Sequence, residues 1–241
     1  MVFATKERIT AHRLFSTRRY ILSTHPVLYI SGRRDFQGTN QFLSDDAYGY
    51  LCTRTGALWI LQGYSFDGLD DKIDCGSPAT LDNLFDAGGT VIVWANASNV
   101  ANNIVMCSKL AANAGWEFGI SSPVGNNALF EVYHYWSGTD GYWQTSSKVF
   151  SRSVWHCVGF TYNSSATTNN AILYKNGVSQ AISTTSPTGT RDSDAANAFT
   201  IGGLPGGTKM WEGTIGEVFA YNRILTALEI QQIYQVTRWR Y

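Results

Sequence analysis

Residues 211–234, WEGTIGEVFAYNRILTALEIQQIY, decide the fold of this chain. The first half alternates apolar residues with polar or small ones, which is typical of a β-strand because successive side chains of a strand point to opposite faces. A short turn follows. In the second half Thr226 and Glu229 have the spacing of a capping box, and the apolar residues after them predict one compact helix.

Residues 65–76, SFDGLDDKIDCG, lie far upstream, and between these two segments the chain reads as short strands separated by turns. The strongest hairpin signal is Asn176-Gly177, since a type I′ turn needs positive φ at both central residues. Strands are predicted at residues 27–30, 50–53, 57–61, 72–75, 89–95, 103–108, 116–120, 128–136, 142–144, 155–162, 171–174, 178–182, 198–202 and 213–221. No repeat or linker divides this body, so we expect one all-β domain over residues 26–241.

The early FDGLDDKI run and the late GTIGEVFAYNRILTALEI run resemble the laminin-G-like branch of the concanavalin A-like lectin/glucanase superfamily. Residues 173–178 (LYKNGV) and the run from Trp155 to Tyr162 match further patterns of that branch. Gly216 stands where the branch commonly has Asp. The resemblance implies a two-sheet antiparallel jelly-roll sandwich with one short C-terminal helix, covering one end or edge of the sandwich.

The formal net charge is zero, but residues 1–34 carry +6 and the remainder −6. We interpret residues 1–25 as a basic N-terminal arm. Its arginines, interleaved with large apolar residues, predict docking on acidic groups of a partner. The predicted docking residues are Arg8, Arg13, Arg18 and Arg19. Another protein of the same assembly, such as a neighbouring copy, is the favoured partner. Nucleic acid is disfavoured because the body itself is acidic.

Targeting signals are not visible in the sequence. Arg and His interrupt every apolar run near the N-terminus, so no signal peptide is expected, and no segment reaches the roughly 18 apolar residues of a membrane span. The four cysteines show no zinc-ligand spacing. We expect them to be buried free thiols rather than disulfides.

Glycoside hydrolysis is the sharpest enzymatic alternative on this fold. It needs two carboxylates facing one groove, about 5–10 Å apart. The hydrolase branch of the superfamily places them along one strand as E-x-D-x-E, whereas residues 129–136 (LFEVYHYW) contain Glu131 alone. The sequence therefore predicts no catalytic residues and a protein that is not an enzyme.

The same segment favours carbohydrate binding, because sugar rings stack their CH faces on aromatic side chains while polar groups bind the hydroxyls. Tyr133 and Tyr135 share one face of the predicted strand, and His134 and Trp136 share the other. One pair enters the core and leaves the other for a platform. We predict the carbohydrate-binding residues Trp136, Tyr142, Trp143 and Asp140, at least one of them an exposed stacking ring.

Calcium is common in this superfamily, and it takes six to eight oxygen ligands. Among the acid-rich turns, Asp70 and Asp71 are the preferred metal ligands; the alternative is that they are two solvated carboxylates. No other cofactor is indicated.

Two functions therefore remain open from the sequence. The first is a non-catalytic carbohydrate-binding or adhesion module. The second is a structural decoration protein, docked through its arm on a larger assembly such as a phage particle. Binding requires exposed aromatic rings beside polar loops, whereas decoration requires only an ordered arm and protein contacts.

Overall fold

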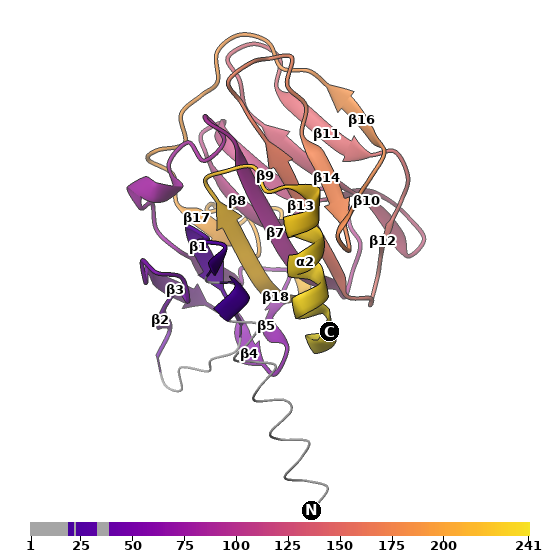
Figure 1. Ribbon diagram of the computed structural model, residues 1–241. Helices are drawn as coiled ribbons and strands as arrows, with labels where there is room; N and C mark the ends of the chain where they lie inside the picture. The colour runs from indigo at the N-terminus through magenta and orange to yellow at the C-terminus, as the bar shows by residue number, and fades with distance from the viewer. Residues whose placement is uncertain (1–18, 22, 33–38) are drawn as a thin grey trace, which may run out of the picture.

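The computed structural model describes residues 19–21, 23–32 and 39–241. They form two antiparallel sheets packed face to face, as predicted (Figure 1). The eight-stranded sheet has the order β15 (Val178–Ser179), β14 (Ile172–Lys175), β13 (His156–Tyr162), β7 (Gly89–Ala97), β18 (Glu212–Tyr221), β5 (Gly63–Asp67) and β4 (Leu58–Ile60), and β1 (Leu28–Ile30) also pairs with β18.

The second sheet is ten-stranded. Its order is β16 (Ile182–Thr185), β11 (Gly141–Thr145), β10 (Asn127–His134), β9 (Ala114–Val124), β8 (Ile104–Ala111), β17 (Phe199–Ile201), β6 (Lys72–Asp74), β3 (Leu51–Thr55) and β2 (Gln41–Leu43), and β12 (Phe150–Ser151) also pairs with β10. Between the sheets lies a core rich in aromatic rings, with Trp116, Trp143 and Trp211 fully buried. Asn176 and Gly177 have φ of 51° and 81°, which confirms the predicted hairpin.

Strand β7 is buried on both faces, which explains the unbroken apolar run at residues 91–95. Val91, Val93 and Ala95 point into the core between the sheets. Ile92 and Trp94 point the other way, into a second apolar cluster on the outer face of the eight-stranded sheet. The period of two thus divides the strand between two cores.

Helix α2 (Ala227–Thr237) covers that outer face (Figure 1). Thr226 and Glu229 form the predicted capping box, with both reciprocal hydrogen bonds present. The helix packs on the face of the sheet through Ile230 and Ile233, so the expected position at an end or edge of the sandwich is wrong. The outward side chains of β7, β13 and β18 are apolar here and need a cover.

The chain after α2 continues as a short 3-10 turn, η2 (Arg238–Arg240). Arg240 forms an ion pair with Glu217 of β18, which is fully buried, and the Tyr29 hydroxyl donates to Glu217 Oε1 at 2.6 Å. This contact holds the C-terminal segment against the outer face of the sheet. Another 3-10 turn, η1, spans Ala79–Leu81.

The described part of the predicted arm begins at Arg19, which is exposed. Ile21 is fully buried in the outer cluster, the Tyr20 hydroxyl donates to Gln232 Oε1 at 2.7 Å, and Thr24 Oγ1 lies 3.0 Å from the Tyr221 hydroxyl. The packed body therefore starts before residue 26. The predicted docking residues Arg8, Arg13 and Arg18 lie outside the described residues.

Candidate functional site

The hairpin of β10 and β11 carries the residues predicted to bind carbohydrate. The register pairs Val132 with Trp143 and Tyr133 with Tyr142. Because Val132 faces the core, its partner Trp143 does too, and its ring packs 4.5 Å from that of Tyr162. Trp136 is 7% exposed, and its indole Nε1 donates to His134 Nδ1 at 3.0 Å. Trp136 and Trp143 are therefore buried and are not stacking rings, and Tyr142 is the one predicted ring that remains partly exposed.

Tyr133, Tyr135 and Tyr142 lie on the opposite, outer side of the hairpin and are half-buried. The Tyr133 ring centroid is 4.8 Å from that of Tyr135 and 5.8 Å from that of Tyr142. We call these three rings the tyrosine face. The strand alternation predicted that one pair of aromatic residues enters the core and the other remains outside, and the structure confirms the alternation with Tyr133 and Tyr135 outside.

Hydrogen bonds fix the orientation of two of these rings, Tyr133 and Tyr142. The Tyr133 hydroxyl donates to Asp140 Oδ2 at 2.7 Å, and the other carboxylate oxygen of Asp140 accepts the backbone N–H of Trp136 at 2.8 Å. The Tyr142 hydroxyl contacts Glu131 and lies 3.0 Å from Gln144 Oε1. Asp140 thus supports the tyrosine face and the turn together.

Two carboxylates lie beside the tyrosine face. Glu131 of β10 is opposite Gly119, and Glu117 of β9 is opposite Tyr133, so the two glutamates are diagonal neighbours on one sheet face. Glu117 pairs with Lys209 at 2.5 Å, and Glu131 accepts hydrogen bonds from Ser121 and Tyr142. Burial raises the pKa of Glu131, and the charge of Glu117 adds to that effect.

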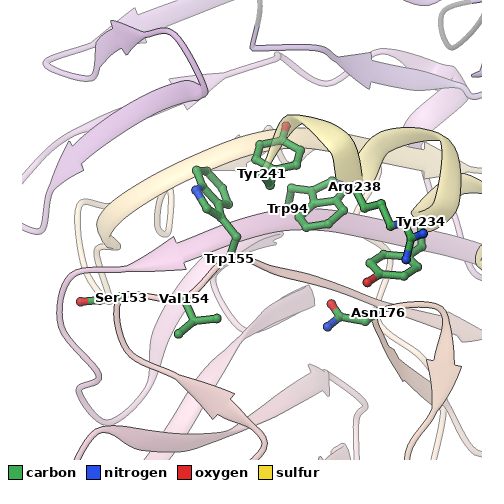
Figure 2. Close-up of a pocket in the computed structure, with 8 residues that line it drawn as sticks. All are labelled: Trp94, Ser153, Val154, Trp155, Asn176, Tyr234, Arg238 and Tyr241. Carbon is green, nitrogen blue, oxygen red and sulfur yellow. The ribbon is translucent and has the colours of Figure 1, made fainter. Parts of the chain in front are cut away.

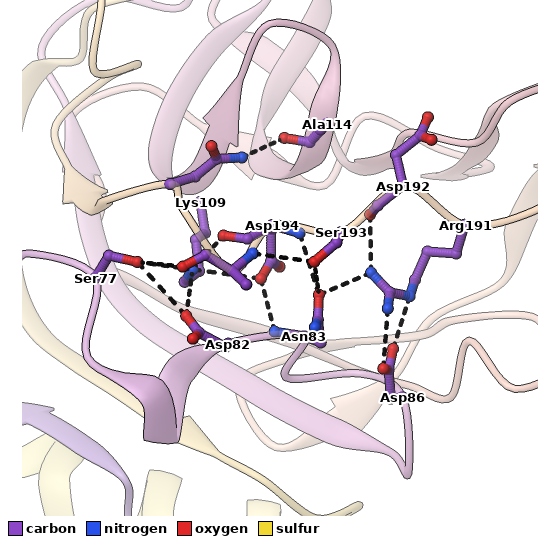
Figure 3. A network of polar contacts seen from close by, with 12 residues as sticks. Ser77, Asp82, Asn83, Asp86, Lys109, Ala114, Arg191, Asp192, Ser193 and Asp194 are labelled. Carbon is purple, nitrogen blue, oxygen red and sulfur yellow. Dashed lines mark hydrogen bonds and ion pairs between the residues drawn. The ribbon is translucent and has the colours of Figure 1, made fainter.

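A hollow of about 490 Å³ lies beside Trp136, at the loop that contains Arg191. The Arg191 guanidinium forms an ion pair with Asp86 at 2.6 Å and donates to Asn83 Oδ1 at 2.9 Å (Figure 3). A buried lysine, Lys109, holds the same loop through an ion pair with Asp194 at 3.3 Å. The charged groups of the hollow are thus paired with one another, and the network anchors the loop.

A second cavity, of about 460 Å³, lies where helix α2 and the C-terminal segment meet the ends of strands β7 and β13 (Figure 2). We call it the aromatic pocket. Its lining consists of Trp94, Ser153, Val154, Trp155, Asn176, Tyr234, Arg238 and Tyr241. The Tyr241 ring lies between two indoles, with centroids 4.3 Å from Trp94 and 4.5 Å from Trp155.

The sequence did not reveal the aromatic pocket. Trp94 and Trp155 both lie in strand-like runs, a pattern that favours core positions for both. Trp94 is buried as expected, but Trp155 is only partly covered because the cover on this side is the C-terminal segment. The signal that could have found the pocket is the concentration of aromatic and basic residues at 234–241.

The metal prediction falls on a cluster of three carboxylates at the turn after β5. Oxygens of Asp67, Asp70 and Asp71 lie within 4.8 Å of one another. Asp67 Oδ1 accepts the Leu69 backbone N–H at 2.8 Å, and Asp71 Oδ2 accepts the Asp67 N–H at 2.9 Å. Burial raises the pKa of Asp71, and the neighbouring charges of Asp67 and Asp70 act in the same direction. Carboxylate oxygens are the donor type that calcium prefers.

Comparison with known protein families identifies the superfamily of this chain. A model of the concanavalin A-like lectin/glucanases superfamily matches residues 67–231, more than half of the chain. The chain belongs to that superfamily. This confirms the resemblance seen in the sequence and the predicted fold class. No curated protein sequence matches the chain.

Solved structures with this fold include the binding domain of botulinum neurotoxin serotype G, with 16% identity and a TM-score of 0.59. The match covers 88% of this chain and 51% of the neurotoxin domain. Trypanosoma rangeli sialidase with the inhibitor DANA gives 14% identity and a TM-score of 0.62; the match covers 96% of this chain and 38% of the sialidase. The chain therefore spans about half, or less, of these two structures.

Domain 4 of the arabinanase AbnA from Geobacillus stearothermophilus, solved with arabinotriose, gives 16% identity and a TM-score of 0.50, covering 86% of this chain and 87% of that domain. At these identities the likeness concerns the fold alone. Across the described residues, no helix has the length and apolar character needed to cross a membrane.

Proposed function

We propose that this protein is a non-catalytic carbohydrate-binding module that binds a glycan on the tyrosine face. The observation that carries the proposal is the group of three partly exposed rings, Tyr133, Tyr135 and Tyr142. Hydrogen bonds to carboxylates and an amide hold two of them, Tyr133 and Tyr142, in a fixed orientation. Sugar rings stack on such faces, and the surrounding oxygens and amides bind hydroxyls. The lectin-like fold and the arabinotriose-bound neighbour support the same function.

The decisive experiment is a glycan-array screen of the whole chain, followed by titration of the bound glycan against alanine variants. Tyr133→Ala and Tyr135→Ala should each weaken binding by about 1–3 kcal/mol, by analogy with base–aromatic stacking. Tyr48→Ala is the matched control, because Tyr48 is an exposed tyrosine that stacks on Tyr50, outside the tyrosine face. Binding that survives both tyrosine-face changes would place the site elsewhere.

Binding is favoured over hydrolysis by the state of the two carboxylates. Glu117 and Glu131 are more than nine-tenths buried, and each is engaged by neighbouring side chains. Hydrolysis needs one carboxylic acid and one carboxylate that both reach the scissile bond. The pair of glutamates on neighbouring strands is nevertheless the feature that keeps hydrolysis as the second candidate, and it is tested below.

The decoration role remains the alternative function, with the basic arm as the docking element. Arg19 is exposed and available for it, while the other predicted docking arginines lie outside the described residues. Removing residues 1–18 tests this role while keeping Ile21 in place. Loss of assembly with other proteins, or of self-association, would support docking; unchanged assembly would argue against it.

Calcium binding at Asp70 and Asp71 remains a prediction, and Asp67 is the third carboxylate of the same cluster. Isothermal titration with calcium chloride measures it directly. Asp70→Asn should abolish the heat because it removes one of the charged ligands, and it leaves the hydrogen bonds of Asp67 and Asp71 intact. No heat with the unsubstituted chain would leave the cluster as a turn-forming element.

A further inference from the structure

Several side chains that line the aromatic pocket are hydrogen-bond donors. Among the described residues, no acceptor is found for the indole N–H of Trp155, the hydroxyl hydrogen of Tyr234 or the side-chain amide N–H groups of Asn176. The Asn176 oxygen is occupied, since it accepts the Cys157 backbone N–H at 3.0 Å. A donor-rich wall of this kind matches a ligand that offers oxygen acceptors.

Arg238 is the charged residue of the pocket lining. Its side chain is exposed, and its guanidinium carbon lies 5.8 Å from the centroid of the Tyr234 ring. Within the described part of the chain, Arg238 forms no ion pair, and the pocket lining contains no carboxylate side chain. This arrangement contrasts with Arg191, which is paired with Asp86. An unpaired guanidinium beside unpaired donors favours an anion.

The aromatic rings give the pocket two flat apolar surfaces. Figure 2 shows Trp155 at one side and Tyr234 with Arg238 at the other, with Trp94 and Tyr241 between them. Trp94 is held firmly, because its indole donates to Thr237 Oγ1 at 2.8 Å and its ring stacks on that of Tyr234 at 5.8 Å. A volume of about 460 Å³ lies within the range of small-molecule sites and is large enough for one or two sugar rings.

We infer that the aromatic pocket is a second binding site, specific for an acidic saccharide whose carboxylate pairs with Arg238 and whose ring packs on Trp155 or Tyr234. The inference does not depend on the tyrosine face. The pocket lies on the outer side of the eight-stranded sheet, whereas the tyrosine face belongs to the ten-stranded sheet. Either site can therefore fail without the other.

The test is isothermal titration of the full chain with three probes: trigalacturonic acid, its neutral counterpart galactotriose, and sodium sulfate as a bare anion. Trigalacturonic acid should bind, and the other two should not. Arg238→Gln and Tyr234→Phe each remove one polar contact and leave the aromatic rings in place. Arg238→Gln should weaken binding about tenfold or more, because hydrogen bonds to charged groups are the strong ones.

Two controls separate this site from the rest of the surface. Arg54→Gln makes the same change of charge on β3 of the other sheet, and Tyr133→Ala disrupts the tyrosine face; neither should alter binding of the acidic probe. Equal binding of the neutral trisaccharide, competition by sulfate alone, or an Arg238→Gln variant with unchanged affinity would each overturn the inference. Loss of binding in Tyr133→Ala with Arg238→Gln unaffected would move the acidic ligand to the tyrosine face.

Discussion

The Tyr133 hydroxyl donates a 2.7 Å hydrogen bond to Asp140 Oδ2, and this bond joins the proposed binding face to the turn that ends the β10–β11 hairpin. The second Asp140 oxygen accepts the Trp136 backbone N–H, so one carboxylate fixes both the exposed ring and the backbone that leads to the buried ring. Asp140 was predicted as a ligand-binding residue, and its hydrogen bonds make it a positioning residue for Tyr133.

Asp140→Ala should therefore destabilise the protein by about 1–2 kcal/mol, since two hydrogen bonds to a partly exposed carboxylate are lost. It should also weaken glycan binding without removing an aromatic ring. Urea unfolding measures the first effect and titration the second. Thr139→Ala, on the same turn, is the matched control; equal losses in both variants would show that the turn, rather than the carboxylate, matters.

Trp143 and Tyr142 are adjacent in sequence, but substitution of Trp143 should cost more stability, whereas only substitution of Tyr142 should act on glycan binding. Trp143→Ala opens a cavity in the core between the sheets and should cost about 3–5 kcal/mol of unfolding free energy. Tyr142→Ala acts on a half-buried ring and should cost about 1–2 kcal/mol while weakening glycan binding. Thermal or urea unfolding of both variants checks this. Similar costs for the two would contradict the observed orientation of β11.

The two glutamates give a prediction about chemistry. The protein should not cleave glycosidic bonds, because Glu117 is paired with Lys209 and Glu131 is engaged by Ser121 and Tyr142. Reducing-end assays on a panel of polysaccharides provide the measurement. Turnover that disappears in Glu131→Gln, with folding intact by circular dichroism, would establish the hydrolase alternative instead.

His134 predicts a dependence of stability on pH. Burial, with a smaller effect from the charge of Arg191, lowers its pKa from the ordinary value of 6.5 to about 3. Between those two values the unfolded chain binds a proton that the folded chain does not, so the free energy of unfolding falls as the pH falls. The contribution is about 1.4 kcal/mol per pH unit for one such histidine.

The measurement is urea unfolding at several pH values between 7 and 4, comparing the unsubstituted chain with His134→Gln. Buried carboxyls with raised pKa, such as Glu131 and Asp194, act in the opposite direction in both chains and cancel in the difference. The His134→Gln chain should lose less stability on acidification. His25→Gln, at an exposed histidine, serves as control, and identical slopes in all three chains would refute the prediction.

Ile21 tests where the packed body begins. Its side chain is fully buried in the outer cluster, so Ile21→Ala should cost about 2–5 kcal/mol. Thermal unfolding against an exposed control, Arg19→Ala, measures it. If Ile21→Ala changes the free energy of unfolding by nearly zero, residues 19–25 belong to the arm rather than to the packed body.

Much of the fold could be predicted because short local sequence patterns specify its elements. Thr226 and Glu229 define the start of the helix, Asn176-Gly177 defines a hairpin, and period-two runs define the longer strands. The face on which α2 packs could not be predicted in this way. Residues 91–95 are apolar throughout, and such a run shows that a strand is buried on both sides without showing what covers each side.

The binding residues were harder to predict. Alternate residues of a strand point to opposite faces of the sheet, and the sequence alone does not say which set faces the core. In residues 142–143 both side chains are large and aromatic, so the sequence does not say which one enters the core. The register with Val132 decides it. The aromatic pocket depends on residues 94, 155, 176, 234 and 238 meeting from distant parts of the chain, and such a meeting follows from tertiary packing alone.

Strand β18 has a consequence for how the protein is made. It pairs with β1, β5 and β7, all of which precede it by more than a hundred residues, and every other strand of the eight-stranded sheet is translated before it. During synthesis on the ribosome, the backbone groups of β1, β5 and β7 that pair with β18 therefore have no β18 partner until residue 221 has emerged. Pairing between strands so far apart in sequence is slow, and unpaired strand edges can pair with those of other nascent chains. The yield of folded protein should accordingly be sensitive to expression temperature and to chaperones that shield β edges.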